Sequence, residues 1–350
     1  MKIAFERHKV FRLADKTVSW GVFIILLATY WLTVPPTVSL WDCPEYVTSA
    51  WRLEPGHPPG NPFWMLVERI FTLFVPGKYA ALAINLSSGL FTALAGMLLA
   101  KCIFIGAVWV LKTRDGHRRR LHALYAAGAA TVGALAFGWC DSVWYSAVEA
   151  EVYAMSIFLT ALSVWLMLKW ARAASVTLAW RYLILLAYVF GLSLGVHQLN
   201  LLVIPALAVV WALRRGIHSI WRIAEIALVS LAAVGCVLVG MMPSTIAIAA
   251  EMELFAANVL GLPLLTGVAA YILILGITLI VALTVTRRSS NKGALTVAIF
   301  PPLFMSGLFI FAGNFLAGAA ISALAAIIIV RTTSLSYKHI RAQENKQDLE

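Results

Sequence analysis

The segment SLWDCPEYVTSAWRLEPGHPPGNP, residues 39–62, separates two long apolar stretches and carries an unusual density of acidic, basic and aromatic side chains. Its first half suits a short helix beginning at Pro44. Four prolines and two glycines in its second half exclude a continuous helix there. Asp42 and Glu45 lie near the start of the predicted helix, where the helix dipole favours carboxylates. We therefore expect any chemistry of this chain to centre on this segment.

The rest of the chain is strongly apolar. Of its 350 residues 61% are hydrophobic and 12% charged, whereas a soluble domain is about half apolar and a quarter charged. Apolar segments of about 20 residues, the length that spans a bilayer as a helix, recur along it. The sequence therefore predicts an all-α integral membrane protein with about ten transmembrane helices. The predicted spans are 19–36, 79–111, 121–139, 153–169, 182–197, 199–213, 221–242, 263–286, 294–312 and 314–330.

The basic residues predict how the chain lies in the membrane. In this assignment 23 of the 27 Lys and Arg residues fall on the same side as both termini, and positive charge marks the cytoplasmic side. The first loop, residues 38–78, is then extracytoplasmic, and we expect a multi-pass protein of the cell inner (plasma) membrane. We expect a polytopic transmembrane domain over residues 1–330 and a polar cytoplasmic tail over residues 331–350.

Residues 63–75 form an apolar stretch that does not fit a span. It has 13 residues and contains Glu68 and Arg69. Such a segment is too short and too charged to cross the hydrocarbon, so we expect an interfacial helix in the first outer loop.

Further polar residues fall on the predicted outer side. Polar groups at membrane depth are costly unless they pair or line a cavity, so we expect them to converge with Asp42 on one site. They are Glu149, Glu151 and Tyr153 in the loop 140–153, His197 and Asn200 at a tight turn, and Asn85 near the start of the second span.

Several of these side chains also have structural interpretations. If their segment is helical, Glu149 and Tyr153 lie one turn apart and Glu151 points elsewhere. The structural alternatives are a salt bridge from Glu149 to Arg52 or Arg69, and a helix cap made by His197.

Neither a metal nor a disulfide framework follows from the sequence. Asp, Glu and His from separate loops provide ligands that Mg²⁺ or Mn²⁺ accepts, but no ligand spacing is diagnostic. We expect no cofactor and leave a divalent metal open. Cys43 and Cys140 fall on the same predicted side, so a bridge between them is an alternative to free thiols.

Four motifs carry a family resemblance: TVSLWDCPEY (37–46), LEPGHPPGNP (53–62), DSVWYSAVEAEVYAMS (141–156) and GLSLGVHQLN (191–200). Together they resemble a bacterial family of multi-spanning membrane proteins. That family is similar to an animal membrane O-mannosyltransferase of plexin-type extracellular domains, within the GT-C glycosyltransferase superfamily. The resemblance covers roughly residues 18–215.

The resemblance implies a GT-C-like helix arrangement, a polyprenyl-phosphate-linked sugar donor and a hydroxyl acceptor, on Ser or Thr of an exported protein. It also implies a catalytic acid in the first outer loop, where Asp42 and Glu45 stand. The sequence departs from the family pattern at Pro44, Tyr46 and Asn61, where glycine, phenylalanine and a small residue are usual. Both acids are retained.

We expect Asp42 to act as the general base of an inverting transfer, with Glu45 orienting the acceptor or assisting as base. Arg52, His57 and Arg69 are the nearest outer cations for the leaving phosphate. The remaining predicted substrate-binding residues are Trp41, Asn85, Glu149, Glu151, Tyr153, His197 and Asn200.

Two other functions remain open. A transporter or flippase of a lipid-linked or polar substrate explains polar groups within the membrane, but it does not explain the acidic, rigid first loop, and no internal repeat is evident. A non-catalytic assembly scaffold is the second. The net charge of +11 does not indicate nucleic-acid binding, because the basic residues lie in short loops between spans.

Overall fold

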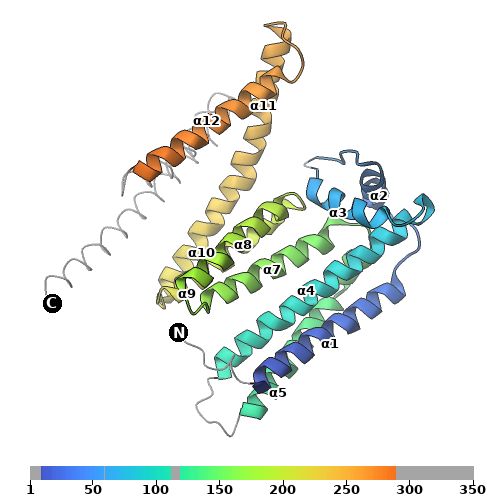
Figure 1. Cartoon of the computed structure of the whole chain (residues 1–350), viewed down its shortest axis with the longest axis vertical. Coiled ribbons are helices and arrows are strands. Elements are labelled where there is room, and N and C mark those ends of the chain that lie inside the picture. Colours follow the sequence, from blue (N-terminus) through green and yellow to red (C-terminus); the bar gives the residue numbers. More distant parts are fainter. Residues whose placement is uncertain (1–8, 59, 112–118, 289–350) are drawn as a thin grey trace, which may run out of the picture. The chain divides into compact units, whose positions relative to one another are not determined.

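The computed structural model describes residues 9–58, 60–111 and 119–288, and these residues are helical apart from short connections (Figure 1). The chain divides into two compact units at Ala227. Each unit is described separately.

The first unit holds the four motif segments of the sequence and most of the described helices. Its elements are α1 (Lys9–Thr33), α2 (Cys43–Arg52), α3 (Pro62–Thr72), the 3-10 turn η2 (Gly77–Tyr79), α4 (Ala80–Leu111), α5 (Arg119–Gly138), α6 (Asp141–Val148), α7 (Val152–Ala171), α8 (Val176–Leu194), the 3-10 helix η4 (Gln198–Val203), α9 (Ile204–Arg214) and the start of α10 (Ile220–Gly235).

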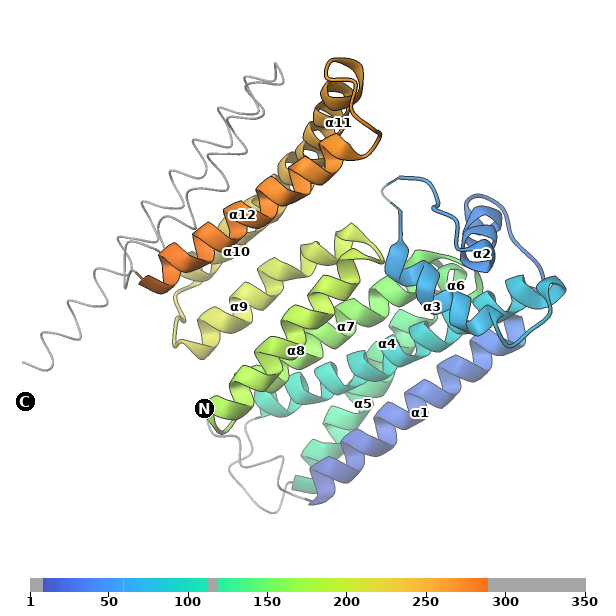
Figure 2. The same ribbon diagram turned by 45° about the horizontal axis from the view of Figure 1, so that its top comes forward.

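The long helix α4 lies at the centre of this unit and contacts α1, α5 and α7 (Figure 2). Small side chains let α5 approach its neighbours. Ala123, Ala126, Ala130 and Ala134 recur every three or four residues along α5 and are all buried. Van der Waals contact between small residues is the main source of helix association in a membrane, since lipid is as apolar as leucine.

Leu26 and Tyr30 of α1 fill the space that two glycines leave. A Cβ atom added to Gly96 of α4 or to Gly138 of α5 would collide with the Leu26 side chain. The Tyr30 hydroxyl donates a buried hydrogen bond of 2.7 Å to the Gly138 carbonyl oxygen. The helices α1, α4 and α5 therefore interlock around these two side chains.

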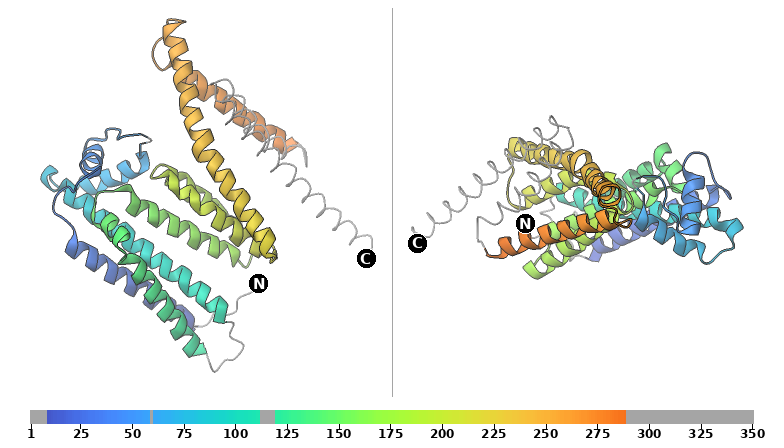
Figure 3. Two further views of the ribbon diagram at one scale, coloured as in Figure 1. Left: turned by 180° about the vertical axis from the view of Figure 1, so that it is seen from behind. Right: turned by 90° about the horizontal axis from the view of Figure 1, so that it is seen from above.

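A second apolar cluster joins the first outer loop to the bundle. It brings together buried residues of α2, α3, α7 and α8, including Cys43, Tyr46, Trp64 and Met155. Figures 1 and 2 show α2 and α3 at one end of the long helices, and the view from behind in Figure 3 agrees. The loop is thus a folded part of the unit.

The second unit is described as far as Arg288. It contains the rest of α10, a π-helical turn η5 (Cys236–Met241), α11 (Met242–Asn258) and α12 (Thr266–Arg288). The helices α11 and α12 contact each other. The Glu253 carboxylate of α11 accepts hydrogen bonds from the backbone N–H groups of Leu265 (2.5 Å) and Val268 (3.1 Å), which caps the first turn of α12.

Five of the described helices are long and apolar enough to cross a membrane: 77–111, 119–138, 152–171, 176–194 and 220–239. The all-helical prediction is confirmed, and these helices support an integral membrane protein. The count of about ten spans stays a prediction. The helix α1, which contains most of predicted span 19–36, is not among the five, and two further apolar helices, 198–214 and 266–277, are shorter. The predicted spans 294–312 and 314–330 and the predicted tail 331–350 lie outside the described residues.

The predicted orientation can be tested by thiol labelling. Glu54 and Arg181 are both exposed and fall on opposite sides in the predicted topology, while Cys140 is the exposed thiol among Cys43, Cys102 and Cys140. In a Cys140→Ser background, Glu54→Cys should react with a membrane-impermeant maleimide in intact cells, whereas Arg181→Cys should react only after permeabilisation. The Cys140→Ser chain alone measures the background. Labelling of Arg181→Cys in intact cells would reverse the topology and move the first loop to the cytoplasm.

Candidate functional site

The start of α2 places Asp42 at an exposed helix end. Trp41, which precedes it, has φ of +64°, a left-handed conformation that costs a residue with a side chain about 1 kcal/mol or more. Pro44 then fixes the first turn of α2. Asp42 occupies the N-cap position, but its carboxylate makes no capping bond, and the structure gives it no hydrogen bond within the described residues. The carboxylate is therefore open to an outside ligand.

Glu45 holds the proline-glycine loop. Its Oε1 accepts a hydrogen bond of 2.5 Å from the backbone N–H of His57 and lies 3.3 Å from the His57 ring nitrogen Nδ1. Two contacts from one carboxylate close the loop back onto α2. Glu45 thus has a positioning role that is visible in the structure, and its predicted catalytic role stays a prediction.

Tyr46 lies at the centre of the loop. Its ring centroid is 5.6 Å from that of His57 and 5.0 Å from that of Trp64 on α3. Burial raises the pKa of the Tyr46 hydroxyl to about 12, and the negative charges of Glu151 and Asp42 add to the effect. A small cavity of about 100 Å³ opens beside this ring, between α2, the loop and α3, with Gly56 and Asn61 in its wall.

The start of α3 is fixed by the turn that follows α8. The backbone N–H groups of Phe63 and Trp64 both donate to the Gly195 carbonyl oxygen, at 2.8 and 3.3 Å. A Cβ atom on Gly195 would lie only 2.8 Å from the Cβ of Phe63. These contacts bring the motifs LEPGHPPGNP and GLSLGVHQLN together.

Two further acids and a histidine lie near Asp42. The pKa of Glu151 is raised to about 7, mainly by burial and also by the negative charges of Asp42 and Glu149, while His57 acts in the opposite direction. These charges act on one another because loops distant in sequence lie close together. The expectation that Asp42, His57, Glu149 and Glu151 converge therefore has a geometric basis, while their roles remain untested.

The helical interpretation of the Glu149 segment is wrong. The helix α6 ends at Val148, α7 begins at Val152, and both Glu149 and Glu151 have extended backbones, with φ of −117° and −134°. Because the connection is extended, Glu151 is not turned away from the site as it would be on a helix. The structure gives Glu149 no salt bridge to Arg52 or Arg69, contrary to that alternative.

His197 combines a capping role with contact to the site. Its Nδ1 accepts a hydrogen bond of 3.3 Å from the Leu199 backbone N–H at the start of η4, as the capping alternative proposed. Burial lowers the pKa of its imidazole. The His197 ring centroid lies 5.3 Å from that of the exposed Tyr153. Tyr153, two residues after Glu151 in the sequence, therefore contacts His197 across the two loops.

Asn200 and Asn85 lie inside the protein, away from the surface that a substrate would reach. The Asn200 Oδ1 accepts from the hydroxyls of Ser156 (2.6 Å) and Thr160 (2.7 Å), which joins η4 to α7. The Asn85 Nδ2 donates to the carbonyl oxygens of Pro35 (3.0 Å) and Thr37 (3.1 Å). Both side chains serve to hold the backbone, and their predicted substrate-binding role has no support in this geometry.

Arg69 and Arg52 differ in whether their guanidinium groups are available to an anionic ligand. The Arg69 Nη1 donates to the Trp51 carbonyl oxygen at 2.6 Å, and its guanidinium lies 5.1 Å from the Trp51 ring centroid, so it fastens α3 to α2. Arg52 pairs with Glu54 at 3.6 Å on the exposed surface. Such a pair contributes little and can be exchanged for an anionic ligand.

Glu68 is a fully buried carboxyl group, a location that we did not predict from the sequence. We predicted it on an interfacial helix, but α3 turns it inward, where it is fully buried with Trp64 and Thr72 on one face. Ser87 of α4 donates to it, and the Ser87 hydroxyl also lies 2.8 Å from the Ile84 carbonyl oxygen. The single hydroxyl hydrogen of Ser87 cannot bond fully to both the Glu68 carboxylate and the Ile84 carbonyl oxygen. A proton on Glu68 would supply the second donor, so this arrangement favours a protonated Glu68. Burial correspondingly raises the pKa of Glu68 to about 8. The spacing of Trp64, Glu68 and Thr72 at every fourth residue is the signal that could have revealed this face.

No group of three or more His, Cys, Asp or Glu residues within the described part of the chain is arranged to hold a metal ion. Cys43, which is buried, and Cys140, which is exposed, are both free thiols. The disulfide alternative is therefore wrong.

Comparison with known proteins agrees with this clustering of motifs. Residues 42–219 match the model of the protein O-mannosyl-transferase TMEM260 N-terminal domain family, a match that begins at Asp42 and includes every loop of the site. The chain belongs to this family.

A mouse member, protein O-mannosyl-transferase TMEM260, is 27% identical over 176 residues. The match covers 50% of this chain but only 23% of the mouse protein, so this chain corresponds to a minor part of that relative. No solved structure matches.

The contact between Gly195 and α3 predicts a position-specific cost. Gly195→Ala should destabilise the chain by about 1–3 kcal/mol, since the added methyl group collides with Phe63. Gly191→Ala, one turn earlier on α8 with nothing within 4 Å of its Cβ, is the matched control and should be neutral or stabilising. Thermal unfolding in detergent measures both. Equal melting temperatures for the two variants would contradict this docking of α3.

Glu68 predicts a dependence of stability on pH. Its folded pKa of about 8 exceeds the ordinary value of 4.5, so the folded state keeps a proton that the unfolded state loses. The free energy of unfolding therefore falls as the pH rises from about 5 to about 8. Glu68→Gln removes this contribution, so the variant should be more stable than the parent near pH 8 and less sensitive to pH. The exposed Glu54→Gln is the control and should follow the parent. Melting curves across this pH range measure the effect, and a Glu68→Gln curve parallel to that of the parent would contradict the assignment.

Proposed function

We propose that this chain is a membrane glycosyltransferase that moves a sugar from a polyprenyl-phosphate-linked donor to a hydroxyl of an exported protein, on Ser or Thr. Membership of a family named for protein O-mannosyl transfer supports this reaction class. One structural observation carries the proposal. The unpartnered, exposed carboxylate of Asp42 lies within electrostatic reach of the half-buried Glu151, at the end of the bundle that the first loop covers.

In this proposal Asp42 is the general base. The acceptor oxygen forms a bond to the anomeric carbon, the bond from that carbon to the phosphate oxygen breaks, and the hydroxyl proton passes to Asp42. The polyprenyl phosphate leaves with the bonding electrons. A single displacement inverts the configuration at the anomeric carbon. A carboxylate without an internal hydrogen bond is suited to accept the proton, because no protein donor competes for its lone pairs.

Glu151 has a different proposed role. With a pKa near 7 it is partly protonated at neutral pH, so it can donate a hydrogen bond to a sugar or acceptor oxygen. Glu149 and Tyr153 lie next to it and complete the polar surface.

The leaving phosphate requires positive charge. Arg52, whose pairing with Glu54 is exposed and weak, and His57 are the suitable groups on this loop. Arg69 is committed to Trp51 and is less suited to this role. Glu45 holds His57 and its loop in place, which matters because small displacements of catalytic groups reduce rates strongly.

A transporter or flippase remains the alternative function. It requires a polar route through the membrane, whereas the buried polar side chains Asn85 and Asn200 are engaged with protein partners. The structure thus offers more support for a reaction at one end of the bundle.

The proposal is tested by Asp42→Asn. This change keeps the shape of the side chain but removes its capacity to take a proton, so transfer should fall by about 10²–10⁴-fold, the usual contribution of a general base. The measurement is transfer of radiolabelled mannose from polyprenyl-phosphate mannose to protein in isolated membranes, at matched expression. Asp141→Asn, an exposed acid in the first turn of α6, is the control and should retain activity.

Two comparisons distinguish the roles of the acids. Glu45→Gln should lower transfer less than Asp42→Asn. Glu151→Gln should shift the pH profile of transfer near pH 7, because it removes the group that titrates there. Full activity of Asp42→Asn together with loss in Glu45→Gln would exchange the two roles. No effect of any of the three changes would exclude this mechanism and favour transport.

A further inference from the structure

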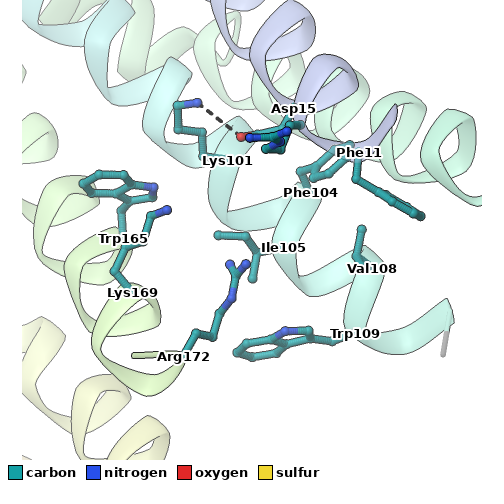
Figure 4. Close-up of a pocket in the computed structure, with 11 residues that line it drawn as sticks. Phe11, Asp15, Lys101, Phe104, Ile105, Val108, Trp109, Trp165, Lys169 and Arg172 are labelled. Atoms are coloured by element: carbon teal, nitrogen blue, oxygen red, sulfur yellow. Dashed lines mark hydrogen bonds and ion pairs between the residues drawn. The ribbon is translucent and has the colours of Figure 1, made fainter. Parts of the chain in front are cut away.

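The first unit contains a second, larger cavity, of about 430 Å³, at the end opposite α2 and α3. Its wall comes from the first turns of α1 and the last turns of α4 and α7, as Figure 4 shows. The site around Asp42 lies instead at the last turn of α1 and the first turns of α4 and α7. The two sites are therefore separated by the length of the bundle, and this cavity plays no part in the proposed transfer.

The cavity is strongly cationic. Arg12, Lys101, Lys169 and Arg172 line it, and Asp15 is the one acid among the described lining residues. Lys101 pairs with Asp15 at 3.5 Å. This pair explains a lysine in the middle of a candidate span, since an ionised group there requires a partner. Arg12 and Lys169 have no ion pair within the described residues, so they leave a surplus of positive charge.

Aromatic and donor groups accompany these charges. The Lys169 ammonium lies 5.3 Å from the ring centroid of Trp165. Figure 4 shows the Arg172 side chain entering the cavity next to the Trp109 ring. The Trp109 indole N–H is buried and has no acceptor within the described residues. Burial lowers the pKa of the Arg172 guanidinium to about 10, so it remains charged at neutral pH. A buried donor without an acceptor, such as the Trp109 N–H, is costly unless a group with hydrogen-bond acceptors is bound, and the cations beside it favour an anion.

We propose that this cavity binds the phosphate headgroup of an anionic phospholipid. The phosphate oxygens accept from Arg12, Lys169 and the Trp109 N–H, a set of donors that includes two cations suited to a phosphate. The apolar side chains of Phe104, Ile105 and Val108 line the same cavity and suit the acyl chains. The cavity lies at the ends of helices that can cross a membrane, which is the depth of lipid headgroups. A free phosphate would use the cations but not the apolar wall.

The test is lipid retention on the purified full chain. The protein is extracted in detergent, mixed with phosphatidylglycerol or phosphatidylcholine, and weighed by native mass spectrometry to count bound lipid at increasing lipid concentration. Phosphatidylglycerol should bind saturably and more tightly than phosphatidylcholine. Arg12→Gln with Lys169→Gln should weaken phosphatidylglycerol binding roughly thirtyfold, about fivefold for each lost charge.

Matched variants separate the cavity from general surface charge. Lys16→Gln with Arg181→Gln removes two exposed cations that do not line the cavity, and it should leave the affinity unchanged. Lys169→Arg retains the charge and should bind lipid, which controls for folding together with the melting temperatures. Equal binding by the cavity variant and the control variant would overturn the proposal, as would equal affinity for the two lipids. Displacement of phosphatidylglycerol by millimolar inorganic phosphate as effectively as by added phosphatidylglycerol would also overturn it, because the ligand would then be a soluble phosphate.

Discussion

Two backbone hydrogen bonds to the carbonyl oxygen of Gly195 determine where the first loop lies. They use the N–H groups of Phe63 and Trp64, two of the donors that the start of any helix leaves without an internal partner. Because α3 is held there, Trp64 enters the core next to Tyr46, and Tyr46 in turn contacts His57. The position of the loop over the bundle, and with it the surroundings of Asp42, depends on this contact between segments distant in sequence.

The hydrocarbon core explains why the polar groups gather at the helix ends. Within it each backbone N–H and C=O must find a partner in its own helix, so irregular backbone is confined to the ends or to places where protein covers it. The segments that carry Asp42, Glu151 and His197 are all connections of this kind. The helices act as a scaffold, and the chemistry depends on which loops meet at a given end.

Much of this was predictable from the sequence, for identifiable reasons. Apolar length and composition indicated the helical membrane fold, and the prolines after Pro55 indicated a loop between α2 and α3. The family resemblance identified the four motifs as parts of one protein family. Contacts between distant segments were not predictable. The sequence does not reveal that Asn200 binds Ser156 or that Arg69 stacks on Trp51, because each contact depends on packing that periodicity does not encode. The spacing of Trp64, Glu68 and Thr72 indicates a shared helix face, but not that this face packs against Ser87 of α4.

The helix α4 has 32 residues, about 48 Å at 1.5 Å per residue, which exceeds the hydrocarbon thickness of about 30 Å. A rigid helix of this length responds to a thinner or thicker bilayer by changing its tilt. Its first turns contact α2 and α3, and its last turns line the cationic cavity. Any change of tilt therefore moves both regions at once. The position of the first loop then depends on the thickness of the surrounding membrane.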